Sequence, residues 1–418
     1  MTMLAVPWYF TQILGLPGRF GLLYALVSFT LFFWRTFTGS LVDRYSRKRI
    51  FLVLNSVNGM LMLVIAAVGL HLGQTPSFLA MLAFAATIYN FNIHYPNLYA
   101  LCQELSQSKH YGKINSLIEI QAQVTTVISG ALAGILLSGA SDGAMTILGQ
   151  MVQLPFTFQA FDLADILLID GGTYLVSALL MLGIRYTPQT RRDIERGSLP
   201  KRLRSGYRFL TERPRLLWFG IGSYSVFAII LVFSFFLLPQ YIRLAIGGEA
   251  DVYGSAEMTL AAGALAAGWL SPTLMRRYAL VGAVQVTLVL ASVLMFLLAA
   301  FPDEGLLYAV MACLGWCNSS LRVYRITYIF RKTPNGVIGR TNSLFSMVNI
   351  GERMLFLGIF SLPFFDHPEH IRYPFWFFGF FLVGSWAVIA WLFQRPRRSA
   401  AKKPAHTPGS WPTASVVR

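Results

Sequence analysis

Long apolar runs separated by short polar breaks dominate the chain. Breaks rich in charged residues, glycine or proline delimit twelve runs, most of them near the roughly 20 residues that a helix needs to cross a bilayer. The runs cover residues 1–14, 19–39, 50–72, 77–101, 115–138, 163–184, 216–238, 252–271, 279–301, 305–330, 341–365 and 373–394. The pattern predicts an all-α membrane protein with twelve transmembrane helices.

The first run is too short to cross a bilayer as a helix. At about 1.5 Å per residue, some 14 residues cannot cross a hydrocarbon core about 30 Å thick. We therefore expect either an N-terminal piece upstream of Met1 or a first helix that is incomplete on its cytoplasmic side.

The composition excludes a soluble protein. Of the 418 residues, 55% are apolar and 12% are charged, about half of the roughly 25% charge of an ordinary soluble domain. No phosphate-binding GxxxxGK[ST] loop, nucleophile with a base, or metal-ligand set is visible. The three cysteines fall in or at the edges of the runs, which favours ordinary packing. We expect no enzyme activity, no cofactor and no metal.

Charge predicts how the helices are oriented. Lys and Arg number 34 against 18 Asp and Glu, a net charge of +16. If the loop at 43–49 (DRYSRKR) and the segment 185–215 are cytoplasmic, the inside loops and the C-terminal tail together hold 27 of these cations and the outside loops hold three. The positive-inside rule then places both termini in the cytoplasm. No basic soluble domain is left over, which excludes nucleic acid as a partner.

The chain repeats itself once. Residues 111–117 (YGKINSL) match 338–344 (IGRTNSL) at an offset of 227, and the Gly39 to Lys48 region matches Gly268 to Arg277 at 229. Two six-helix halves in the same orientation follow, a known transporter plan. We expect an N-terminal half at 1–184, a basic cytoplasmic linker with an amphipathic helix at 185–215, a C-terminal half at 216–394 and a disordered basic tail at 395–418.

The loop after the second run resembles the signature loop of the major facilitator superfamily. It reads GSLVDRYSRKR over 39–49, with Ser46 in place of the second glycine of the signature. The matches are Gly39, Leu41, Asp43, Arg44, Arg47 and Lys48. Segments at 6–9, 96–105, 169–179, 205–210 and 339–346 look like the branch of the enterobactin exporter and macrolide-efflux permeases.

The resemblance implies the major facilitator fold and a cytoplasmic gate built from Gly39, Asp43, Arg44, Arg47 and Lys48. A glycine near a helix end lets helices approach closely, and ion pairs can hold their inner ends together. The alternative is a basic loop that only sets topology.

Charges inside the runs are costly and mark candidate functional residues. Besides Arg35 and Asp170, which lie in the second and sixth runs, we predict a substrate or proton path from charged residues and nearby amides. The path residues are His94, Glu119, Arg322, Arg325, Glu352, Arg353, Asn90, Asn92 and Asn318. In the fold that the resemblance implies, their helices border the central cavity.

Within this set, Arg322 is the expected partner of Glu352, which leaves Arg353 or Arg325 to meet an anion. Three alternatives stay open. Arg325 snorkels to the inner interface, His94 and Glu119 belong to the gate, or Glu352 and Arg353 serve in structural ion pairs.

We expect a secondary transporter of the bacterial inner membrane that works as a monomer. It would export a small organic anion or amphiphile, of the siderophore type, in exchange for protons carried by Glu352 or Glu119. One alternative is a multidrug or macrolide-type efflux pump for apolar cations, and another is a transport-inactive sensor with the same fold. Export as the direction rests on the resemblance alone.

Overall fold

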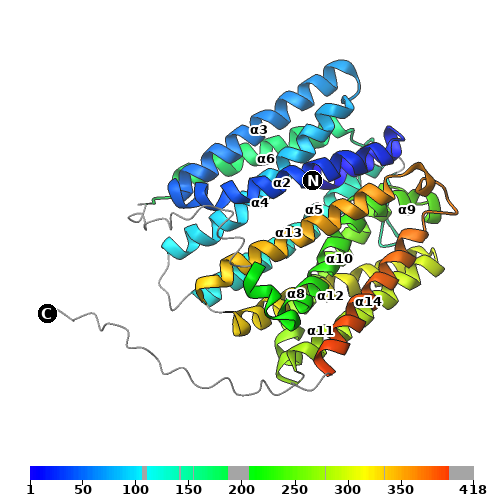
Figure 1. The fold of residues 1–418 in the computed structure, drawn as a ribbon. Helices are drawn as coiled ribbons and strands as arrows, with labels where there is room; N and C mark the ends of the chain where they lie inside the picture. Colours follow the sequence, from blue (N-terminus) through cyan, green and yellow to red (C-terminus); the bar gives the residue numbers. More distant parts are fainter. Residues whose placement is uncertain are drawn as a thin grey trace, which may run out of the picture.

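The computed structural model describes residues 1–105, 111–140, 143–153, 155–186, 207–277, 279–333 and 335–394. The N-terminal half has six helices, the first of which continues as the π-helical segment η1. They are α1 (Thr2–Trp8) with η1 (Tyr9–Ile13), α2 (Pro17–Arg44), α3 (Arg47–Leu72), α4 (Ser77–Leu105), α5 (Tyr111–Ser138) and α6 (Leu163–Gly183). Figure 1 shows them running side by side with the helices of the C-terminal half.

The C-terminal half has the same number of long helices, the first of which is a stack of four segments. They are α8 (Pro214–Val232) with η3 (Phe233–Leu237), α9 (Leu238–Tyr241) and η4 (Ile242–Ile246), then α10 (Ala250–Arg277), α11 (Leu280–Ala300), α12 (Glu304–Lys332), α13 (Asn335–Phe360) and α14 (Tyr373–Gln394), with a short 3₁₀ turn, η5 (Pro363–Phe365), before the last. The predicted twelve-helix fold is confirmed. Among the described residues, nine helices are long and apolar enough to span a membrane.

Local signals explain where the helices begin and end. Ser46 caps α3 by accepting a hydrogen bond from the Arg49 N–H at 3.3 Å, and Gly73, at φ 70°, ends the same helix. The predicted seventh run stopped at residue 238, but the helix continues to Ile246 through π turns around Pro239. The predicted eleventh run reached 365, but α13 ends at Phe360, shortly before Pro363.

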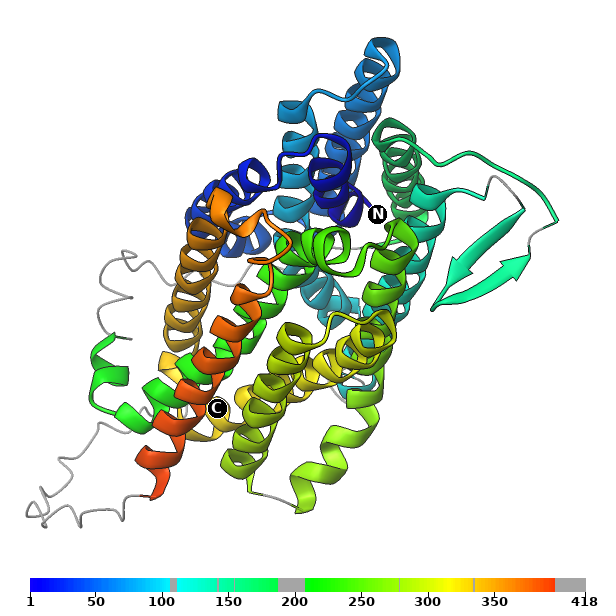
Figure 2. The same ribbon diagram turned by 90° about the vertical axis from the view of Figure 1, so that its right-hand side faces the viewer.

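Two ends of the bundle can be named from their loops. The end that carries the turn between α2 and α3, with Arg47 and Lys48, is called the basic end. The other end is called the hairpin end because the loop between α5 and α6 forms two short antiparallel strands there, β1 (Ala144–Ile147) and β2 (Gln150–Gln153). Positive φ values at Leu148 (53°) and Gly149 (73°) fit a tight hairpin turn. The sequence analysis did not predict this hairpin, which Figure 2 shows at the edge of the bundle.

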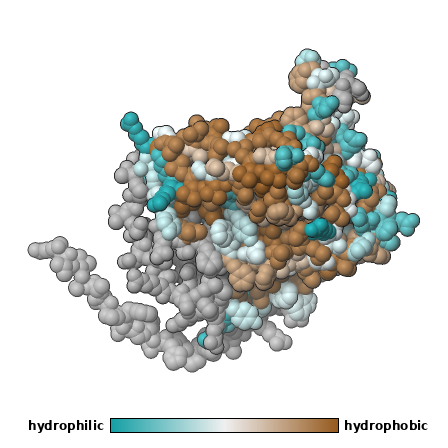
Figure 3. Space-filling view, turned by 90° about the horizontal axis from the view of Figure 1, so that it is seen from above, coloured by the Kyte–Doolittle hydropathy of each residue, from teal (hydrophilic) through white to brown (hydrophobic). Residues whose placement is uncertain are grey.

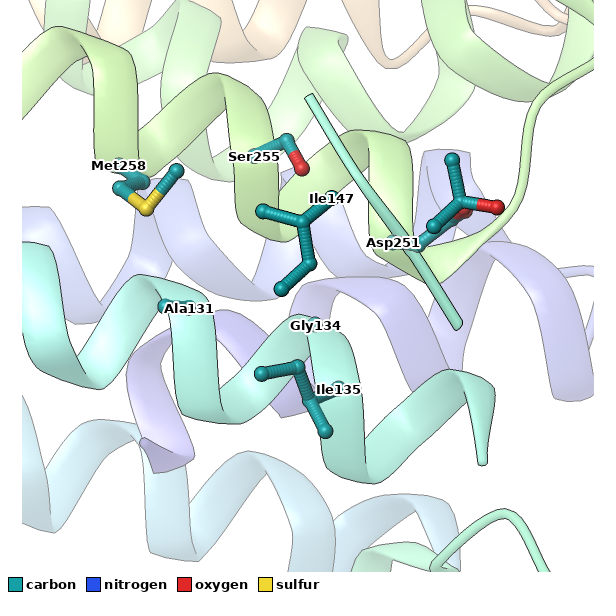
Figure 4. Close-up of a pocket in the computed structure, with 8 residues that line it drawn as sticks. Ala131, Gly134, Ile135, Ile147, Asp251, Ser255 and Met258 are labelled. Carbon is teal, nitrogen blue, oxygen red and sulfur yellow. The ribbon is translucent and has the colours of Figure 1, made fainter. Parts of the chain in front are cut away.

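The hairpin of the N-terminal half lies against the C-terminal half. The Leu148 N–H donates a hydrogen bond to Ser255 Oγ of α10 at 3.1 Å. Ile147 lies over the junction of α5 and α10 near Gly134 (Figure 4), and Thr146 lines the same small cavity. The cavity left there is about 10 Å³, room for about one water, so this junction is essentially filled.

Helix packing sets which helices are central. On the outside, α3 packs on α6 and α11 packs on α14, while α5 with α10 and α2 with α13 join the two halves. The α5–α10 crossing depends on glycine. A Cβ at Gly254 would lie 2.5 Å from the Gly134 Cα, closer than atoms can approach, so the two backbones touch directly.

Aromatic side chains join the halves toward the hairpin end. The Phe20 ring on α2 lies 6.5 Å from that of Phe236, and Phe84 on α4 lies 6.5 Å from Phe235. Both partners belong to η3. Viewed from above, much of the described surface is apolar, with polar residues gathered toward the margins (Figure 3). This surface suits a bilayer.

Candidate transport path

A buried arginine lies on the seam between the halves. Arg353 of α13 is 5% exposed, and its guanidinium carbon lies 5.7 Å from the centre of the Tyr24 ring on α2. Its Nε has no hydrogen-bond partner among the described residues. Because α13 begins at Asn335 and ends at Phe360, Arg353 lies about two turns from the hairpin-end terminus of its helix.

A buried carboxylate that the sequence analysis missed lies on α10. Glu257 is 4% exposed, and its Oε1 has no hydrogen-bond partner among the described residues. The Ser234 hydroxyl of η3 lies beside it, and Tyr253, one turn earlier on α10, donates to the Ser234 carbonyl at 3.0 Å. The Trp8 ring of α1 stacks on Tyr253 at 5.8 Å. The signal was present in the sequence, since Glu257 is an acidic residue well inside an apolar run.

Glu352 meets a serine where the sequence analysis expected an arginine. The Ser225 Oγ of α8 donates to Glu352 Oε1 at 2.8 Å. The other carboxylate oxygen is buried with no hydrogen-bond partner among the described residues. Arg322, the expected partner, is half-buried on α12.

Arg325 points into the C-terminal half. Its Nη1 donates to the Ser223 carbonyl of α8 at 2.8 Å, and its guanidinium carbon lies 3.6 Å from the centre of the Tyr224 ring. Only 5% of the residue is exposed. Asn349 of α13 donates to the Tyr224 carbonyl at 3.1 Å, so Arg325 and Asn349 tie α12 and α13 to the same turn of α8.

The remaining predicted path residues are distributed over α4, α5 and α12. Those on α4 have side chains with different neighbours. The His94 ring packs 5.0 Å from Phe51 of α3, an outer helix. Asn92 donates to the Ile88 carbonyl of its own helix at 2.9 Å, and Asn90 is buried. Asn318 is half-buried on α12. The side chain of Glu119 lies outside the described residues.

Two residues of the predicted gate, Arg47 and Lys48, have described side chains at the basic end. Arg47 Nε lies 3.3 Å from Glu104 Oε1 of α4, and the Tyr186 hydroxyl, just after α6, donates to the same carboxylate. Burial and the adjacent Glu104 raise the pKa of Tyr186 to about 12. Lys48 Nζ donates to the Leu182 and Ile184 carbonyls at 2.8 and 2.7 Å. The side chains of Asp43 and Arg44 and the surroundings of Gly39 lie outside the described residues.

The cation of Lys48 therefore sits at the C-terminal end of α6, where the free carbonyls and the helix dipole favour positive charge. Arg47 and Lys48 connect α3 to α4 and α6, all within the N-terminal half.

Comparison with known proteins identifies the family. The sequence profile of the Major Facilitator Superfamily matches residues 1–351. The chain belongs to this superfamily. No curated protein matches the chain. A solved structure of the nucleoside transporter NupG has a TM-score of 0.70 at 14% identity, covering 94% of this chain and 95% of its own.

Other superfamily structures with different substrates in their names are similarly close. A D-xylose-proton symporter has a TM-score of 0.67 at 12% identity, covering 93% of each chain. A bacterial homologue of the iron transporter ferroportin, in an inward-facing state, has 0.62 at 17% identity, covering 94% of this chain and 96% of its own. At these identities the likeness establishes the fold. The chain is a multi-pass membrane transporter of the superfamily, which handles small-molecule substrates.

The superfamily assignment accounts for the kind of chemistry present. Among the described residues, no group of three or more His, Cys, Asp or Glu side chains converges as metal ligands would. The candidate path offers basic and acidic side chains among the described residues, from Arg353, Glu257 and Glu352. Such groups can bind ions and exchange protons.

Proposed function

We propose that the chain is a secondary transporter that exports a small organic anion or amphiphile, of the siderophore type, in exchange for protons. The observation that carries this proposal is Arg353. Its guanidinium is buried against the Tyr24 ring on the seam where the halves must move apart, and a charge at membrane depth is too costly to keep there without a role. The ring face stabilises the cation and leaves N–H donors for an anion.

Alternating access would proceed by separation of the halves at one end and closure at the other. The aromatic contacts of η3 with Phe20 and Phe84 hold the hairpin end together. With 27 of the Lys and Arg assigned to one side of the membrane, the basic end would be the cytoplasmic one. The path in this conformation would then load from the cytoplasm.

Proton exchange would use the buried carboxylates of the C-terminal half. Glu257 Oε1 and Glu352 Oε2 each lack a hydrogen-bond partner among the described residues, and a carboxyl group can take up and release a proton. In the antiport that we propose, an anion bound at Arg353 and protons bound at these carboxyls would cross the membrane in opposite directions.

The test is transport by the purified chain in proteoliposomes, with a labelled catecholate and a labelled hydroxycarboxylate as candidate anions. Arg353→Ala should lower anion transport about 100-fold, because it removes a buried charge that binds the substrate, while Arg353→Lys keeps part of the activity. The matched control is Arg213→Ala, which removes an exposed arginine that also lies over an aromatic ring, 4.0 Å from the centre of Phe209. Normal transport by a well-folded Arg353→Ala protein would contradict the proposal.

A second candidate is the efflux of apolar cations, and the buried Glu257 carboxylate favours it. In that case tetraphenylphosphonium should be transported, Glu257→Gln should abolish its transport, and Arg353→Ala should leave it intact. If the chain transports neither anions nor cations yet folds normally, the transport-inactive sensor is the remaining interpretation.

A further inference from the structure

The hairpin between α5 and α6 has no counterpart in the C-terminal half. By the sequence repeat, α5 and α6 correspond to α13 and α14, whose connecting loop carries the 3₁₀ turn η5 and no strand among the described residues. A pair of equivalent helices is thus joined in one half with a hairpin and in the other without one. The hairpin is therefore not required to join these two helices.

The turn of the hairpin leaves one backbone N–H outside the ladder and uses it on the other half. Ile147 pairs with Gln150, which leaves Leu148 and Gly149 as a two-residue turn in which both φ values are positive. Such turns favour Asn-Gly, and a bulky side chain rarely adopts a positive φ. The Leu148 N–H donates to Ser255 Oγ of α10 at 3.1 Å. The residue with the unfavourable backbone conformation is therefore the one that bonds the C-terminal half.

Three side chains of the C-terminal half surround this turn. Ser255 is 5% exposed and also forms a side-chain hydrogen bond with Tyr308 of α12. The Tyr308 hydroxyl donates to Glu304 Oε1 at 2.7 Å, and a Cβ added at Gly149 would lie 3.5 Å from that same oxygen. The turn of the N-terminal half therefore lies against α10 and α12 at once. We call the contact of Leu148 and Gly149 with these three side chains the hairpin clamp.

The hairpin clamp crosses a junction between parts that move. It lies beside the close crossing of α5 and α10, where the cavity lined by Ile147 and Ser255 is only about 10 Å³ (Figure 4), so the surfaces are in full contact. In alternating access the two halves separate at one end of the bundle and approach at the other. A contact between two parts that separate exists in one conformation and is broken in the other.

From this geometry we infer that the hairpin clamp holds the hairpin end of the bundle closed, and that Leu148 has to leave Ser255 before this end can open. The clamp shifts the equilibrium between the two conformations toward the closed one by its own free energy. The inference rests on the superfamily fold. It is independent of the substrate, the direction of transport and the proton sites.

The experiment measures the distance between the halves at the hairpin end, using the full chain in lipid nanodiscs. The native cysteines Cys102, Cys313 and Cys317 are first replaced. Spin labels are then attached through His71→Cys at the end of α3 and Glu369→Cys in the loop before α14, both exposed positions. Double electron–electron resonance gives the populations of the short and long distances, and thus the ratio of open to closed molecules.

Two changes weaken the hairpin clamp to different degrees. Ser255→Ala removes the acceptor of the Leu148 N–H and should raise the open-to-closed ratio about three- to tenfold, the effect of losing one hydrogen bond. A flexible Gly-Ser linker of equal length in place of residues 144–153 removes the whole clamp and should raise the ratio at least as much. The matched control is Thr259→Val, which removes a hydroxyl one turn along α10 that bonds the Ala256 carbonyl of its own helix at 2.8 Å. It should leave the ratio unchanged.

An open-to-closed ratio that stays at the parent value in both the Ser255→Ala and the linker proteins would overturn the inference. The hairpin would then only cover the crossing of α5 and α10. Because the distances are measured without any substrate, a negative result here leaves the proposed anion export untouched, and failure of anion export leaves the hairpin clamp untouched.

Discussion

The two six-helix halves share one helix order but bury different polar chemistry. Among the described residues of the N-terminal half, the largest polar side chains that are nearly inaccessible are amides, including Asn55, Asn58 and Asn90. The C-terminal half buries ions instead, with Glu257, Arg325 and Arg353 all at most 5% exposed. Among the described residues, the charged side chains that are at most 5% exposed lie in the C-terminal half, and the side chains of Arg35 and Glu119 in the N-terminal half lie outside the described residues. Our proposal assigns ion handling to the C-terminal half.

The N-terminal half adds features of another kind. Its described charge pairs are Arg47 with Glu104 at the basic end, which we call the latch, and the amino group of Met1 with Asp170 of α6 at 3.6 Å. The halves therefore divide the work that we propose. One half supplies the charges of the path, and the other supplies the latch. Three substitutions test this division. The first is at the contact between the two halves, the second at a buried carboxyl of the C-terminal half, and the third at the Arg47–Glu104 pair of the N-terminal half.

The largest effect is expected at the glycine crossing, which belongs equally to both halves. Gly254→Leu would push a side chain into the Gly134 backbone, where even a Cβ would lie 2.5 Å away. We expect a loss of about 3 kcal/mol or more in the free energy of unfolding and loss of transport. Thermal unfolding in detergent and transport in proteoliposomes measure both.

Gly268→Leu is the matched control for this prediction. It lies on the same helix, and a Cβ added there would have no other atom within 4 Å among the described residues. Its melting temperature should stay within about 2 °C of the parent protein, since exposed substitutions seldom change stability by more than about 0.5 kcal/mol. Similar losses in both variants would mean that α10 tolerates no added volume anywhere, and the close crossing would have no special role.

Most of the helical scaffold could be predicted from the sequence, because a membrane demands long apolar runs with internally satisfied backbones. What could not be predicted depends on rotation about each helix axis. In a run that is apolar on all sides, periodicity does not reveal which face meets a neighbour. For this reason Glu352 was assigned to Arg322, whereas it meets Ser225 of α8.

The remaining misses have local causes. The hairpin at Ala144–Gln153 has strands of only four residues, which give little alternating pattern, and it is held by a contact with Ser255 that no local signal predicts. The seventh helix extends beyond its predicted end at residue 238, because π-helical turns on either side of Pro239 continue it. Glu257 was visible in the sequence, but its burial beside Ser234 came only from the fold. Arg47 was named among the gate residues, but its partner Glu104 was not named.

A second change addresses the ions of the C-terminal half. Glu257→Gln keeps the shape and a hydrogen-bonding group but removes the group that can exchange a proton. If Glu257 carries the proton, export should no longer respond to an imposed pH gradient, whereas the parent protein should export at least about tenfold faster when the hairpin side is acidic. Transport with and without the gradient measures this coupling. Glu212→Gln, at an exposed carboxylate near the basic end, is the control. Unchanged pH dependence in Glu257→Gln would shift the assignment to Glu352.

The smallest effect is expected at the latch of the N-terminal half, where Arg47 and Glu104 are 14% and 19% exposed. Because the pair is only partly shielded from water, a double-mutant cycle of Arg47→Ala and Glu104→Gln should give a coupling energy of about 1 kcal/mol, measured from unfolding in detergent. Lys48→Ala with Glu104→Gln is the control cycle, since Lys48 bonds the end of α6 instead and should couple by less than about 0.3 kcal/mol.

If the pair acts as a latch, breaking it should also change the rate of transport, because a contact that forms in only one conformation shifts the equilibrium between conformations by its own energy. A full coupling energy with unchanged transport would mean that Arg47 only fastens α3 to α4, and the mechanistic difference between the halves would then rest on the buried ions alone.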